Sequence, residues 1–179
     1  NKALSKYVEK VAFQEPPYTT SIDLVNHIKE ATPDSLNYLI KDMFETITLY
    51  QNRVVETKSE KLDNGKYKVD IEFKVSKYRN NEKGRAFYGE EERDSITYQS
   101  DDMKKPEYSV FLKDYIDIGI FGEDNDEKEI ELYLKKHKIS KIHNKISIIV
   151  DQEPIEVGID PYNKLIDTNS EDNRKKIEK

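Results

Sequence analysis

Over the first 48 residues, apolar side chains recur every three or four positions, which is the spacing of one face of an α-helix. In the first such segment this face consists of Ala3, Leu4, Tyr7, Val8, Val11 and Ala12. The Pro16-Pro17 pair ends the segment, because proline has no backbone N–H and clashes with the preceding helical turn. The pattern predicts a first helix with a single apolar stripe.

Two further helices are predicted before residue 48. Thr20 or Ser21 caps the second, which runs through Ile28 with Asp23 in its positively polarised first turn. The third starts at 32–35, where a threonine, a proline and an acid stand in the order favoured at a helix N-terminus. Its apolar face is predicted to consist of Leu36, Leu39, Ile40, Met43, Phe44 and Ile47.

After about residue 50 the apolar period changes to two, which is typical of strands that bury one face. Val55, Thr57 and Ser59 alternate with polar residues, and Asn64-Gly65 predicts a hairpin turn because this pair tolerates positive φ angles. The next strand has an apolar and a charged face. The apolar face is Tyr67, Val69, Ile71, Phe73 and Val75, and the charged face is Lys66, Lys68, Asp70, Glu72 and Lys74.

The remaining segments also read as short strands without helices between them. A turn is predicted at 80–84, and an edge strand with a loop at 85–110. Residues 115–121 are apolar on both faces, which predicts a central strand. Alternation then returns at Ile130, Leu132 and Leu134, at Ile142, Ile146, Ile148 and Val150, and at Val157 and Ile159.

Six or seven consecutive strands predict a mainly β fold: an antiparallel, Ig-like β-sandwich preceded by two or three helices. The predicted organisation is a helical segment over 1–48, the sandwich over 49–168 and a charged, solvated tail over 169–179.

Composition narrows the possible functions. The 179 residues include no cysteine, which excludes disulfides, thiol catalysis and thiolate metal sites. The net charge of −6 comes from interspersed acids and bases, so no nucleic-acid-binding face is predicted, and the acidic balance disfavours an anionic membrane surface. No apolar run approaches the roughly 20 residues of a membrane span, so no membrane insertion is predicted.

The residues that could bind a metal do not have the pattern of a known metal site. Among the three histidines, His27, His137 and His143, the latter two lie among lysines that repel a cation, so surface roles are favoured. Asp167, Asn169, Glu171 and Glu178 have the spacing of a calcium loop, but Asp172 and Arg174 stand where it needs glycine and an apolar residue. The acidic run 123–127 is predicted to be a hairpin tip.

Tyrosines and lysines on the strands have two interpretations each. The twelve tyrosines could stack on sugars or bases, although half-buried packing is favoured. A set of lysines is predicted to protect the sheet from pairing with other chains, and a basic binding groove is the alternative. These lysines are Lys66, Lys68, Lys74 and Lys77.

Three blocks, in order, carry a family resemblance: residues 12–24, residues 114–121 and residues 160–173. Together they resemble the C-terminal portion of zinc aminopeptidases of the membrane alanyl aminopeptidase family, above all the bacterial branch fused to an ABC-transporter permease. The resemblance implies that residues 1–48 end the peptidase helical region and that the sandwich follows the catalytic domain.

The family's G-x-M-E-N and H-E-x-x-H motifs are absent from this sequence. No catalytic, cofactor-binding or metal residue is therefore predicted here. Zinc and the peptide substrates are expected at the catalytic domain of the same polypeptide, which is this region's expected partner. The resemblance implies a soluble, non-catalytic module that supports or gates that domain in a membrane-anchored bacterial protein. It does not decide which side of the membrane the module faces.

The alternative is a free-standing Ig-like sandwich that binds peptide or carbohydrate. It predicts an exposed patch of tyrosines on one sheet. Inward-packed tyrosines together with a bare apolar stripe on the first helix would instead indicate a partner domain.

Overall fold

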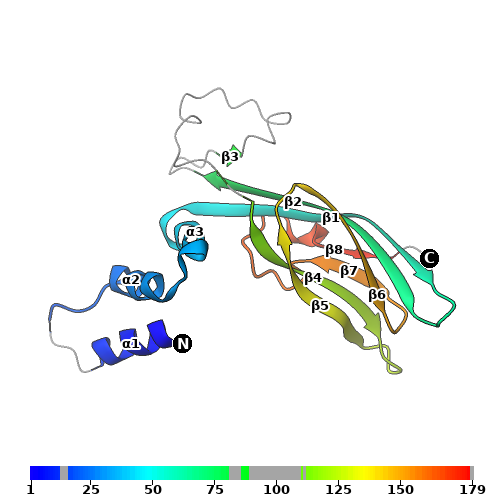
Figure 1. Ribbon diagram of the computed structural model, residues 1–179, viewed down its shortest axis with the longest axis horizontal. Coiled ribbons are helices and arrows are strands. Elements are labelled where there is room, and N and C mark those ends of the chain that lie inside the picture. Colours follow the sequence, from blue (N-terminus) through cyan, green and yellow to red (C-terminus); the bar gives the residue numbers. More distant parts are fainter. Residues whose placement is uncertain (13–15, 81–85, 89–109, 111, 178–179) are drawn as a thin grey trace. The chain divides into compact units, whose positions relative to one another are not determined.

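The computed structural model describes residues 1–12, 16–80, 86–88, 110 and 112–177 (Figure 1). The chain divides into two compact units, Asn1–Thr48 and Leu49–Lys179. Each unit is described by itself.

The first unit contains α1 (Lys2–Val11), α2 (Ser21–Ala31) and α3 (Asn37–Ile40). The first two helices confirm their predictions. α2 begins with a capping box, in which the Asp23 carboxylate accepts the backbone N–H of Thr20 at 2.8 Å. α1 packs on α2 through the edge-on rings of Tyr7 and His27, whose centroids are 6.3 Å apart, and through a Lys10–Asp23 ion pair at 3.5 Å.

The third predicted helix is shorter than its apolar spacing indicates. A 3-10 turn over Asp34–Leu36, α3 and a π turn over Lys41–Glu45 replace one continuous helix. Ile47, predicted on the helix face, instead begins a strand. β-Branched residues at 46–48 favour the extended chain, and the Thr46 hydroxyl closes the last turn by donating to the Lys41 carbonyl at 2.9 Å.

One sheet of the second unit is built around β2 (Tyr67–Asn80), the hydrogen-bonded neighbour of β1 (Ile47–Lys61), β3 (Ala86–Tyr88) and β6 (His143–Val150). The predicted hairpin turn joins β1 to β2, and Gly65 has a φ of 81° there. β6 runs antiparallel to β2, with Tyr67 opposite Val150 and Lys74 opposite His143.

The other sheet has the order β5-β4-β7-β8. Its strands are β4 (Asp114–Glu123), β5 (Glu129–Ile139), β7 (Glu156–Ile159) and β8 (Arg174–Lys176). β4 lies between β5 and β7, which confirms the predicted central strand. The acidic run 123–127 forms the β4–β5 hairpin tip, where the Asp124 N–H donates to the Lys128 carbonyl at 2.9 Å.

The predicted solvated tail is wrong for its central part. β8 pairs antiparallel with β7, from Glu156 opposite Lys176 to Gly158 opposite Arg174. The Asn173 carbonyl accepts the Ile159 N–H at 2.8 Å. Charged side chains led to the prediction, but a strand pairs through its backbone and leaves such side chains at the sheet surface.

The two sheets pack as an antiparallel β-sandwich (Figure 1). The protein is mainly β, as predicted. Both sheets supply the shared core, which consists of Val54, Val69, Ile71, Phe73, Val75, Ile116, Ile118, Ile120, Ile139, Val150, Val157 and Ile159. The apolar face predicted for β2 is therefore confirmed.

In β1 the predicted alternation needs correction. Thr48, Tyr50, Asn52 and Val54 are buried, whereas Val55 is 39% exposed and burial resumes at Thr57. Near residue 55 the inward-facing positions of the strand thus change from even-numbered to odd-numbered residues. A count of the alternation period alone does not detect such a shift. Of the turn predicted at 80–84, Asn80 is the last residue of β2, and 81–84 lie outside the described residues, as does most of the loop predicted over 85–110.

Candidate functional site

The segment after β7 is tied to the second sheet by Asp160. This residue has a φ of 45°, and its carboxylate accepts the backbone N–H groups of Lys164 at 3.0 Å and Leu165 at 2.8 Å. Its own N–H donates to the Asp117 carbonyl at 2.8 Å. Burial raises the pKa of Asp160 above its usual value despite these hydrogen bonds. Asp160 therefore shapes a turn, and its oxygens point at the backbone.

Asp117 on β4 lies beneath two lysines. Its Oδ2 is 2.7 Å from Lys164 Nζ and 3.4 Å from Lys136 Nζ, and its side chain is 7% exposed. Burial acts to raise its pKa, but the two ammonium groups outweigh burial and hold the pKa below its usual value. The carboxylate is thus ionised and neutralised, which suits fastening the closing segment rather than proton transfer.

Among the candidate calcium residues, Asp167 binds backbone groups. Asp167 accepts the N–H of Asn52 at 2.8 Å and the N–H of Asn169 at 2.9 Å. The buried Asn173 amide, oriented to satisfy both its atoms, donates to the Asn52 carbonyl at 2.7 Å. Glu178 lies outside the described residues. Across the described part of the chain, no three acidic or histidine side chains are grouped as a metal site would require.

The histidines occupy three different elements. His27 is on α2 against Tyr7. His137 on β5 has its Nε2 2.7 Å from the Tyr133 hydroxyl, and burial together with nearby Lys135 lowers its pKa. His143 is exposed on β6, opposite Lys74.

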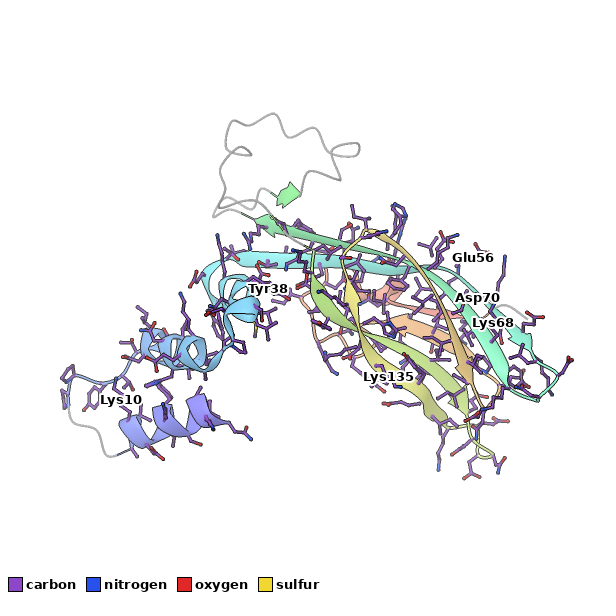
Figure 2. All side chains as sticks on the ribbon, in the orientation of Figure 1. Lys10, Tyr38, Glu56, Lys68, Asp70 and Lys135 are labelled. Atoms are coloured by element: carbon purple, nitrogen blue, oxygen red, sulfur yellow. The ribbon has the colours of Figure 1, made fainter. Side chains whose placement is uncertain are left out.

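A charged hollow of about 370 Å³ lies on the outer side of the β1-β2-β6 sheet. It is lined by Glu56, Thr57, Lys58, Asp70, Ile71, Glu72, Lys145, Ile146 and Ser147. Figure 2 labels Glu56, Lys68 and Asp70 along this face. Its charges are matched in pairs, with Lys58–Glu56 at 2.8 Å, Lys145–Glu72 at 2.7 Å and Lys68–Asp70 at 2.9 Å. Such pairing cancels the local field, and the lining has no aromatic ring for stacking a sugar.

The lysines predicted to guard the sheet differ in environment. Lys66 and Lys68 are surface lysines paired with Asp151 at 2.8 Å and Asp70 at 2.9 Å. Lys77 is different, because its side chain is 1% exposed and contacts both Asp114 carboxylate oxygens at 3.1 Å. The guarding role predicted for Lys77 is therefore wrong. The sequence does contain a signal for this burial, because Lys77 lies two residues after Val75 and so falls on the same, inward-facing side of the strand.

Among the residues that the structure describes, the tyrosines do not form one platform. Tyr50 and Tyr78 are buried at 7% and 6% exposure. Tyr115 and Tyr162 are exposed, but Tyr162 packs edge-on against Phe121 with centroids 6.2 Å apart. Phe121 lies six residues along β4 from Tyr115, which corresponds to about 20 Å of strand.

The helical unit leaves apolar side chains exposed. Leu4 and Val8 on α1 are 57% and 54% exposed, Ile22 on α2 is 68% exposed, and Met43 is 69% exposed. Neither α1 nor α2 contains a buried residue. The stripe predicted for the first helix is thus bare at Leu4 and Val8, as a surface that docks a partner would be.

Comparison with known protein families, with curated proteins and with solved structures finds no match. Within the described residues, no helix combines the length and apolarity needed to cross a membrane.

Proposed function

We propose that this chain is the non-catalytic C-terminal module of a membrane-associated zinc aminopeptidase. In this proposal its helical unit packs against the catalytic domain of the same polypeptide, and the module supports that domain or limits access to it. The observation that carries the proposal is the exposed apolar stripe at Leu4 and Val8 in a helix pair without a buried residue.

Energetics favour a partner for this stripe. Fully burying one leucine or valine side chain stabilises a structure by about 1.5–3 kcal/mol relative to leaving it exposed. Leu4 and Val8 are each more than half exposed, so most of this stabilisation is still to be gained. A neighbouring domain that covers α1 would supply it.

The blocks that carry the family resemblance support the proposal through their packing. The second block lies within β4, and the third begins at Asp160, whose N–H donates to the Asp117 carbonyl at 2.8 Å. Lys164 from the third block also contacts the Asp117 carboxylate at 2.7 Å. Two blocks separated by about forty residues thus build one structural feature.

The first test examines chemistry. With zinc added, the purified chain is expected not to hydrolyse an aminoacyl-p-nitroanilide, whereas the gene's upstream reading frame is expected to encode membrane spans and an H-E-x-x-H motif. Turnover by the chain, or an upstream frame without that motif, would overturn the proposal.

The second test examines docking. The upstream catalytic region, expressed separately, is expected to bind the chain and to lose this binding with the variant Leu4→Asp/Val8→Asp. The variant Lys2→Asp/Lys6→Asp changes exposed polar positions of the same helix and serves as the control. Equal binding by both variants would contradict docking through the stripe.

A further inference from the structure

Positive charge is concentrated in one stretch of this acidic chain. Residues 132–150 contain five lysines, two histidines and no acid. This stretch contributes +5 to the total of −6, so the rest of the chain carries −11. The chain therefore contains a strongly basic segment although its net charge is negative.

The fold places this segment along one edge of the sandwich. β5 pairs only with β4, and β6 pairs only with β2, among the described strands. Both are edge strands, and the short connection 140–142 joins them. The exposed lysines here, hereafter the lysine edge, are Lys135, Lys136, Lys138, Lys141 and Lys145.

Three of these lysines lack a carboxylate partner among the described residues. Lys136 and Lys145 are paired with Asp117 and Glu72. Lys135, labelled in Figure 2, lies over the Tyr133 ring at 5.5 Å instead. Lys138 and Lys141 make no ion pair with the described part of the chain. Lys135, Lys138 and Lys141 thus differ from the lysines of the charged hollow, which include Lys145 and are matched by carboxylates.

We propose that the lysine edge docks on a bilayer surface that contains anionic phospholipids. Basic residues have this affinity, because each lysine without a carboxylate partner adds attraction to the negative surface. The edge contains lysine and no arginine, which suits diffuse attraction rather than bidentate recognition of single phosphates.

A neighbouring side chain favours a bilayer over a nucleic acid. Tyr115 is 52% exposed and lies opposite Lys138 in the β4–β5 register. A tyrosine beside a lysine is typical of the membrane interface, where rings and lysine stems contact lipid while the ammonium groups stay hydrated.

Docking at this edge goes beyond the proposed function and does not rest on it, because it is measured on the chain alone. The purified chain is expected to co-sediment with vesicles of equal parts phosphatidylcholine and phosphatidylglycerol, and not with pure phosphatidylcholine. Each lysine near such a surface strengthens binding about fivefold, so Lys135→Gln/Lys138→Gln/Lys141→Gln is expected to weaken partitioning about a hundredfold.

A matched control variant is Lys2→Gln/Lys6→Gln/Lys61→Gln. It removes the same charge and likewise includes one lysine over a tyrosine ring, because Lys61 Nζ is 5.6 Å from the Tyr67 centroid. The control is expected to bind as the unmodified chain does. Raising the salt from about 0.1 M to about 1 M, which shortens the screening length from about 10 Å to about 3 Å, is expected to abolish binding.

Several results would overturn this inference. The first is that the chain binds both kinds of vesicle equally or binds neither, and the second is that the two variants weaken binding equally. The third is that the chain binds a duplex oligonucleotide more tightly than the anionic vesicles, and the fourth is that soluble glycerol phosphate displaces the chain from the vesicles. The last result would indicate a small-anion site rather than a bilayer surface.

Discussion

The buried Lys77–Asp114 pair offers the sharpest test of how the sandwich is held together. The two side chains are 1% and 5% exposed, and both carboxylate oxygens lie 3.1 Å from Lys77 Nζ. The substitution Asp114→Ala removes the Asp114 carboxylate from beside a buried ammonium group. Removing one partner of such a pair costs about 3–5 kcal/mol of unfolding free energy.

The Tyr50 ring, 5.7 Å from Lys77 Nζ, offsets part of this loss, so the expected cost of Asp114→Ala is about 3 kcal/mol. For a chain of this size that corresponds to a fall of about 10 °C in Tm. The double variant Lys77→Met/Asp114→Ala removes both charges and keeps most of the lysine stem volume. It is expected to be more stable than Asp114→Ala alone, because no charge is left buried.

Urea unfolding followed by far-UV circular dichroism and tyrosine fluorescence measures these differences, since the chain has twelve tyrosines and no tryptophan. Glu56→Ala removes one member of an exposed pair at 2.8 Å and is expected to change stability little. The reasoning is refuted if Asp114→Ala is as stable as the unmodified chain, or if the double variant is less stable than Asp114→Ala.

Two further predictions concern the second sheet. A Cβ at Gly122 would lie 2.9 Å from the Glu153 backbone oxygen, so Gly122→Ala is expected to cost about 1–3 kcal/mol in urea unfolding, and an unchanged midpoint would contradict this packing. Asp117 has a lowered pKa, despite burial, because of Lys164 and Lys136, so its stabilisation is present above the unfolded pKa and is lost as pH falls through the folded value. Lys164→Met is therefore expected to raise the midpoint pH of acid unfolding, whereas identical midpoints would exclude a role for this pair.

Local patterns were sufficient where one rule decided the structure. The Thr20 cap with Asp23, the turn at Gly65 and the period-two face of β2 all depend on interactions between residues close in sequence. The uninterrupted apolar run of β4 also sufficed, because a central strand is covered on both faces. These features identified an antiparallel sandwich behind a helical segment.

Other features depended on pairing between distant segments. The third helix stopped short because the chain at 46–48 is extended as it enters β1. The charged residues 174–176 joined the sheet because β7 offered a free backbone edge. Composition and local period contain no information on such partners, so both predictions failed.

By itself, the sequence determined which residues are apolar, where the first two helices and the strands β2 and β4 lie, and that the G-x-M-E-N and H-E-x-x-H motifs are absent from these 179 residues. Only the tertiary structure decided the environment of each charge. It buried Lys77 against Asp114, fastened Asp117 under Lys164, and left Lys138 and Lys141 exposed along one edge. The physical reason is that the energy of a charge depends on its solvation and its partners, and both are set by residues brought together from far along the chain.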